Sequence, residues 1–216
     1  MYLSKKTKKL FFDRYLYKIA VITPLASNFR GNDMDQTRMY LDSYKDTMLR
    51  DGSTETLVGH SWNRVQVRLD EVYRDLAFTV LLETQTDSTI RVEGTTLSFY
   101  TNEETDIDTI VELYDYHVKE ISKPADDKIK DFLLANPKTI IRPEYSHKYK
   151  VTVNPLDDSA GFKGWAKQLP KLKVMPHNYR LGGYFYVADT KTLSLCHLFL
   201  GDRIRRVDEL RTVSEI

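Results

Sequence analysis

The chain has 216 residues, of which 41% are hydrophobic and 29% are charged, with 32 Lys and Arg against 31 Asp and Glu. This composition excludes wholesale disorder, and a net charge of +1 argues against a uniformly basic protein that coats nucleic acid. The lone cysteine, Cys196, excludes an internal disulfide and a cysteine-based zinc site.

Strands and helices alternate along the first half of the chain. The expected elements are a strand over 10–23, a helix over 33–49, a β-hairpin over 90–101, a helix over 103–114 and a strand over 117–121. Pro24 ends the first strand, Asp33 is suited to cap the first helix, and Gly52 follows that helix. Residues 53–89 keep no single periodicity, so we treat them as an insertion.

A connector precedes the second half, with a helix over 125–135 and an extended link that together make up residues 124–147. The alternation of strands and helices then restarts. The expected elements are strands over 149–153, 172–175, 184–187 and 204–210, and helices over 160–169 and 191–200. Asp189 is placed to cap the last helix, and Gly201 follows it.

Both halves follow the order β-α-β-β-α-β once the insertion is set aside. This order is typical of the ferredoxin-like plait, in which four antiparallel strands carry two helices on one face. We therefore predict an α+β protein of two tandem ferredoxin-like βαββαβ plaits, with an insertion at about 53–89 in the first. The predicted halves are 8–123 and 148–216, joined by the helical connector. One continuous α+β domain without a repeat is the alternative.

A plait leaves one face of its sheet without helices, and strand alternation shows which side chains point there. In the second half, Val151 and Phe185 are expected in the core, which leaves Lys150, Tyr184 and Tyr186 on the open face, with Lys148 beside them. Tyrosines beside lysines can stack on bases and contact phosphates.

The segment Gly183-Tyr184-Phe185-Tyr186-Val187 resembles the third-strand motif of RNA-recognition-motif domains, in which glycine precedes an alternation of aromatic residues. Phe185 replaces the small residue of that motif, Gly182 replaces its basic residue, and Asp189 replaces its last aromatic residue. The resemblance covers residues 148–216. It implies a plait and an open sheet face that binds single-stranded nucleic acid.

The near-neutral charge conceals an uneven distribution. Residues 1–18 hold six basic residues and one acidic residue, and 138–180 hold nine and three, whereas 103–115 hold six acidic residues and none that is basic. A basic, aromatic-rich second half suits contact with a nucleic-acid backbone. Complementary charges that dock two domains or two proteins are the alternative explanation.

No catalytic motif is present, and none of the five histidines is spaced from another like a pair of metal ligands. We therefore expect no cofactor and no metal. Tandem plaits also occur in CRISPR-type endoribonucleases that cleave RNA without a metal, and His147 or His177 would be the general acid or base of such an enzyme. The glycine-rich loop of that family has no counterpart near the C-terminus.

These features favour a non-enzymatic accessory protein that binds single-stranded DNA or RNA. The candidate contacts are Lys148, Lys150, Arg180, Tyr184, Tyr186, Arg205 and Arg206. A motif-poor, aromatic-rich chain suits a phage or other viral protein, located in the host cytoplasm or virion, and no apolar run is long enough for a membrane span. The alternative is a structural protein whose sheet faces and edges mediate assembly, including homo-oligomers.

Overall fold

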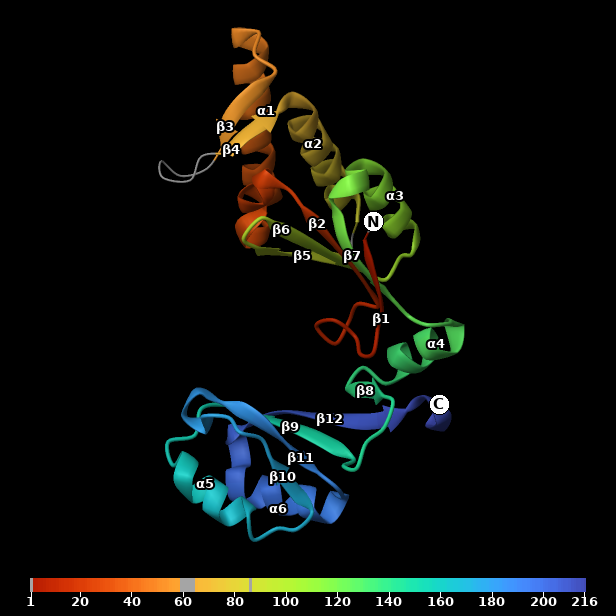
Figure 1. The fold of residues 1–216 in the computed structure, drawn as a ribbon, viewed down its shortest axis with the longest axis vertical. Helices are drawn as coiled ribbons and strands as arrows, with labels where there is room; N and C mark the ends of the chain where they lie inside the picture. Colours follow the sequence, from red (N-terminus) through yellow and green to blue (C-terminus); the bar gives the residue numbers. More distant parts are fainter. Residues whose placement is uncertain (1, 59–64, 86) are drawn as a thin grey trace. The chain divides into compact units, whose positions relative to one another are not determined.

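The computed structural model describes residues 2–58, 65–85 and 87–216, and the chain forms two compact units (Figure 1). The first unit comprises Met1–Thr7 and Arg14–Ala125, and the second comprises Lys8–Asp13 and Asp126–Ile216. Each unit contains one five-stranded mixed sheet with helices, so the predicted class of two tandem α+β units is confirmed. Among the described residues, no helix has both the length and the apolar character that crossing a bilayer requires.

The sheet of the first unit has the strand order β1-β7-β2-β6-β5. Its strands are β1 (Leu3–Lys6), β2 (Tyr17–Ile22), β5 (Ser88–Glu93), β6 (Thr96–Thr101) and β7 (Val118–Lys123). The central strand β2 pairs antiparallel with β6 and β7, and β6 pairs antiparallel with β5. If β2, β5, β6 and β7 are numbered one to four, their order is 4-1-3-2, which is the order of a ferredoxin-like plait.

The helices of the first unit are α1 (Met34–Asp51), α2 (Leu69–Thr84) and α3 (Thr105–Tyr114), with 3-10 turns η1 (Pro24–Asn32) and η2 (Asp115–His117). A small hairpin of β3 (Glu55–Val58) and β4 (Val65–Arg68) lies beside α1 (Figure 1). Helix α2 lies within the stretch treated as an insertion, and its Phe78 is fully buried. The ring of Phe78 meets those of Phe29, Phe99 and Tyr114 edge-on, each at 5.6 Å between centroids. The inserted stretch therefore contributes part of the core.

The single strand expected over 10–23 is wrong in its first half. Strand β2 begins at Tyr17, and Phe12 and Asp13 have φ angles of 53° and 61°. Residues with left-handed backbone cannot continue a strand. Strand β1 was not expected, because all four of its residues are exposed and carry no apolar alternation. It pairs parallel with β7 at the sheet edge.

The sheet of the second unit has the order β10-β11-β9-β12-β8. Its strands are β8 (Thr139–Arg142), β9 (Tyr149–Val153), β10 (Leu172–Val174), β11 (Gly183–Val187) and β12 (Ile204–Thr212). The helices are α4 (Asp127–Ala135), α5 (Ser159–Ala166) and α6 (Thr190–Leu200), with turns η3 (Tyr179–Leu181), η4 (Gly201–Arg203) and η5 (Val213–Glu215). Figure 1 shows α5 and α6 on the same side of this sheet.

The two units share one feature that the predicted repeat lacked. In each, an extra strand precedes strand one of the plait and pairs parallel with strand four at the sheet edge: β1 with β7, and β8 with β12. Strand β8 lies within the link that was expected to be irregular or extended. Each unit is thus a five-stranded version of the 4-1-3-2 plait.

The core of the second unit lies between its sheet and the helices α5 and α6. Val151 and Phe185 of the central strands are fully buried, together with Phe162 of α5 and Tyr179 of η3. The Phe162 ring lies 4.9 Å from that of Tyr179 and 5.3 Å from that of Phe185. The predicted inward side chains are therefore inward, and the residues between them face the other side of the sheet.

Candidate nucleic-acid interface

The face of the second sheet that α5 and α6 leave uncovered carries a group of aromatic and basic side chains. In the strand register, Tyr186 lies opposite Lys150 of β9 and Lys173 of β10, and Tyr184 lies opposite Thr152. Directly paired residues share a face of a sheet. Arg142, at the end of β8, reaches Tyr186 on the same face. We call Arg142, Lys150, Lys173, Tyr184 and Tyr186 the tyrosine face.

The two tyrosines contact each other and two of the cations. Their ring centroids are 5.7 Å apart with an edge-on geometry. The Lys150 ammonium lies 4.3 Å from the centroid of the Tyr184 ring, and Arg142 donates a 3.1 Å hydrogen bond to the Tyr186 hydroxyl. Such cation–π and hydrogen-bond contacts hold the rings in defined positions while leaving the charges without an anion.

The positive charge of the tyrosine face is only partly balanced by nearby carboxylates, since Asp208 lies opposite Lys150 in the strand register without an ion pair between them. Within the described part of the chain, Arg142, Lys150 and Lys173 form no ion pair with a carboxylate. The pKa of Lys150 is lowered, first by burial and then by the nearby charges of Lys9, Arg142 and Arg206, against the opposing effect of Asp208. Mutual repulsion among cations is relieved by a bound anion, so this face is suited to phosphate groups.

Both histidines singled out from the sequence flank the tyrosine face. The His147 ring lies 6.2 Å from that of Tyr186, and its Nδ1 is 2.8 Å from the Ser146 hydroxyl oxygen. Burial and the charge of Lys173 lower the pKa of His147 below its ordinary 6.5, which favours the neutral form of this imidazole. The His177 ring lies 4.6 Å from that of Tyr184.

Glycine permits the tight approach of η3 to β11 that brings His177 beside the strand. Gly182 has a φ of 85°, and a Cβ on Gly183 would lie 3.1 Å from atoms of His177 and Tyr179. The Tyr179 hydroxyl donates to the Tyr184 carbonyl at 2.8 Å and accepts from the Met175 amide at 3.2 Å. These contacts fix the start of β11 and hence the position of its tyrosines.

Two predicted contact residues have partners inside the protein. Arg206 forms ion pairs with Asp13 and Asp208, so its charge is neutralised. Lys148 pairs with Glu209 at 3.8 Å and lies over the ring of Tyr149 at 5.6 Å, away from the two tyrosines of the face.

The remaining two predicted arginines are exposed. Arg180 lies on η3, and Arg205 lies at an irregularity of β12, where the pairing with β9 skips from Ile204 to Arg206. The structure thus brings together Lys150, Tyr184 and Tyr186 from the predicted set. It adds Arg142 and Lys173, which sequence reasoning missed, although alternation along β10 gives a signal for Lys173.

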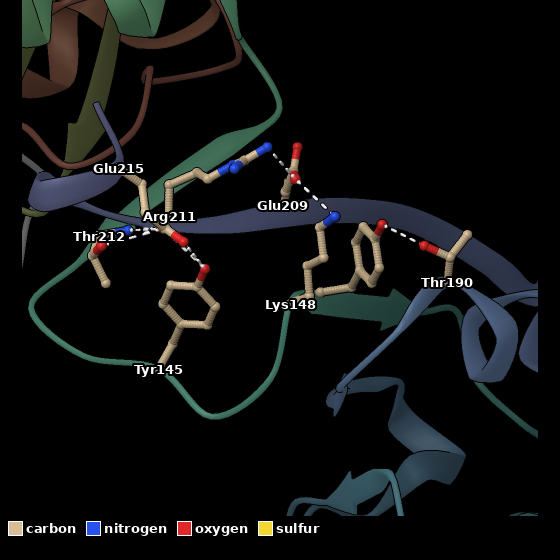
Figure 2. A network of polar contacts seen from close by, with 8 residues as sticks. Tyr145, Lys148, Thr190, Glu209, Arg211, Thr212 and Glu215 are labelled. Carbon is tan, nitrogen blue, oxygen red and sulfur yellow. Dashed lines mark hydrogen bonds and ion pairs between the residues drawn. The ribbon is translucent and has the colours of Figure 1, made fainter.

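A pocket of about 550 Å³ opens on the tyrosine face. Its lining includes Arg142, Glu144, Tyr145, His147, Lys173 and Tyr186. The segment that joins β8 to β9 forms one side of it, and polar contacts seen in Figure 2 hold this segment in place. The Tyr145 hydroxyl donates to the Glu215 carboxylate at 2.7 Å, Glu215 accepts from the Thr212 amide at 2.8 Å, and Glu209 bridges Lys148 and Arg211 (Figure 2).

Within the described ranges, no three His, Cys, Asp or Glu side chains lie close enough together to share a metal ion. Cys196 is buried on α6, and burial raises the pKa of its thiol to about 11, as expected for a core cysteine. Comparison with family models, with curated proteins and with solved structures finds no match for the chain.

Proposed function

We propose that the protein binds single-stranded nucleic acid through the tyrosine face of its second unit, without catalysing a reaction. The observation that carries this proposal is the placement of Arg142, Lys150 and Lys173 around Tyr184 and Tyr186 with no carboxylate partner among the described residues. Aromatic rings provide stacking platforms for bases, and unpaired cations provide contacts to phosphates. A single strand suits this surface because its bases are free to stack.

The test is a binding titration at low salt with 20-nucleotide single- and double-stranded DNA and RNA, repeated across a salt series. We expect the single strands to bind best, with an affinity that falls steeply as salt rises because counterions are released on binding. Replacing both Tyr184 and Tyr186 by alanine removes the platforms. Since stacking on one aromatic residue contributes about 1–3 kcal/mol, the double variant is expected to bind at least tenfold more weakly.

A matched control is available in the first unit. Tyr73 and Tyr116 are exposed tyrosines, at 43% and 88%, whereas Tyr184 and Tyr186 are half-buried. Replacement of Tyr73 and Tyr116 by alanine is expected to leave binding unchanged. Equal losses in both double variants, or no binding of any strand at low salt, would contradict the proposal. Cleavage of the RNA during the titration would favour the endoribonuclease hypothesis, with His147 as the first residue to replace.

A role in assembly is the second candidate, because the helix layer of the second unit exposes an apolar patch. Leu198 and Phe199 of α6 are 84% and 49% exposed, and the Phe199 ring stacks on that of Trp165 at 4.0 Å. Exposed apolar patches of this kind often mark protein contacts. Light scattering tests this role: a stable oligomer that Leu198→Asp converts to monomer would support it, and a monomer at high concentration would contradict it.

A further inference from the structure

The pocket on the tyrosine face has the size of a ligand site. Its volume of about 550 Å³ lies within the roughly 300–1,000 Å³ of small-molecule sites. Lys173 and Tyr186 reach it from the sheet, whereas Arg142 and His147 reach it from the end of β8 and the segment that follows. The contacts of Tyr145 with Glu215 tie that segment to η5, which follows the end of β12 (Figure 2).

The charges of the pocket favour an anion that carries more than one negative charge. Arg142 and Lys173 both line it, and neither forms an ion pair with a carboxylate in the described part of the chain. Glu144 is the acidic residue in the lining, and it is exposed. The His147 imidazole also lines the pocket, and an imidazole can donate a hydrogen bond to an oxygen or, in its neutral form, accept one from a hydroxyl.

We propose that this pocket binds the terminal phosphomonoester of a nucleic-acid strand, with Arg142 and Lys173 on the phosphate and Tyr186 beside the terminal nucleotide. A terminal phosphate carries a charge near −2 at neutral pH, whereas each internal phosphodiester carries −1. Two cations without a carboxylate partner among the described residues therefore favour an end of the strand over its middle. The inference rests on the proposed function, since it assigns one end of the same bound strand.

The two ends of a strand offer the same chemistry, so the experiment separates them. Calorimetric titration of the full chain at low salt compares thymidylate decamers that carry a 5′-phosphate, a 3′-phosphate or no terminal phosphate. One phosphorylated decamer is expected to bind about five- to tenfold more tightly than the unphosphorylated one, because charge-assisted hydrogen bonds are added. Thymidine monophosphates, with thymidine as the control ligand, are titrated in parallel.

Lys173→Ala is the diagnostic variant, because Lys173 is exposed and its replacement leaves the core intact. We expect it to reduce the preference for the phosphorylated decamer to less than about twofold. Lys167→Ala is the matched control. Lys167 is exposed at the end of α5, which packs on the other face of the sheet, so the same loss of charge is expected to preserve the preference.

The outcomes separate this inference from the proposed function. Equal binding of all three decamers, or a preference that survives in Lys173→Ala, overturns the terminal-phosphate site and leaves strand binding intact. If no decamer binds, with or without a terminal phosphate, the proposed function and the terminal-phosphate site both fail. Where the decamers bind, tighter binding of a thymidine monophosphate than of thymidine that requires Lys173 supports the site, and equal binding of the two ligands argues against it.

Discussion

Asp13 forms an ion pair with Arg206, although 193 positions separate the two residues in the sequence. Both belong to the second unit, because the segment Lys8–Asp13 packs there. Arg206 also forms an ion pair with Asp208. In the sheet, Arg206 lies opposite Thr152 of β9, and Thr152 in turn lies opposite Tyr184 of β11. The Asp13 carboxylate therefore neutralises the charge of Arg206 at the border of the tyrosine face, in the way that a bound phosphate would.

Removal of this carboxylate is expected to strengthen strand binding at a small cost in stability. Asp13→Asn leaves Arg206 with one acidic partner, so the affinity for a single strand should rise about two- to threefold at low salt. The free energy of unfolding should fall by about 1 kcal/mol or less, because the pair is partly exposed. Anisotropy titrations and thermal unfolding measure the two effects. An affinity that stays the same or falls in a folded variant would show that Arg206 lies outside the bound strand's reach.

Lys150→Ala is expected to reduce the salt dependence of binding. Each phosphate contact to a single strand contributes about 0.7 to the slope of log affinity against log salt. The loss of one contact should lower the slope by about that amount, and the affinity with it. Arg180→Ala provides the comparison. Arg180 is an exposed arginine of η3 that was predicted as a contact but lies outside the tyrosine face. A slope equal to that of the parent protein would place Lys150 outside the interface.

Phe78→Ala tests whether α2 belongs to the core of the first unit. The ring is fully buried among Phe29, Phe99 and Tyr114, so its removal should cost about 3–5 kcal/mol of unfolding free energy. Tyr73→Ala on the same helix is the control, since this ring is 43% exposed, and it should cost about 1 kcal/mol or less. Denaturant titration compares the two. Similar small losses in both variants would make α2 a peripheral element.

Asp75 gives the first unit a pH-dependent contribution to stability. Its buried carboxylate accepts hydrogen bonds from Tyr114 at 2.7 Å and Thr23 at 2.9 Å, and burial raises its pKa above the ordinary 3.8 despite these bonds and the nearby Arg74. The folded protein therefore binds this proton more tightly than the unfolded chain does. The contribution of Asp75 is largest below pH 3.8 and decreases as pH rises through the folded pKa.

The comparison of the parent protein with Asp75→Asn isolates this effect, since all other titrating groups are common to both. The difference in unfolding free energy, parent minus variant, should become smaller from pH 4 to pH 7. The variant should also be less stable at pH 4, because Thr23, Tyr114 and Arg74 all donate to the Asp75 carboxyl oxygens and the amide nitrogen of asparagine cannot accept a hydrogen bond. A difference that grows with pH would mean that the charged carboxylate is the form that folding favours.

Local patterns account for much of the fold and for the tyrosines. Alternation along β11 placed Phe185 inward and Tyr184 outward, and the side chains of Asp33 and Asp189 accept from the amides of Gln36 and Thr192 at the helix starts, as expected for caps. These signals depend on residues that are close in the sequence. The order 4-1-3-2 of each sheet also follows from the repeat itself.

Long-range pairing explains what the sequence did not reveal. Strand β8 has only four residues and is defined by its parallel pairing with β12. Residues near β8 in the sequence carry no information about that pairing. For this reason Arg142 was not expected on the sheet. Arg206 was expected to contact a phosphate; its partner Asp13 is remote in the chain, although its other partner, Asp208, lies only two residues away. The aromatic residues of 11–17 are typical of a strand, but Phe12 and Asp13 have positive φ angles, which a strand does not accommodate.

The placement of Lys8–Asp13 in the second unit also sets an order of events during synthesis. Leu10 is buried there, the Lys8 carbonyl accepts from the Ile141 amide at 2.7 Å, and Asp13 meets Arg206 on the last strand. During synthesis this segment leaves the ribosome well before its partners on β8 and β12, which lie more than a hundred residues further along the chain. The second unit can therefore be completed only after β12 has been synthesised, and until then the apolar Leu10 cannot reach its buried position.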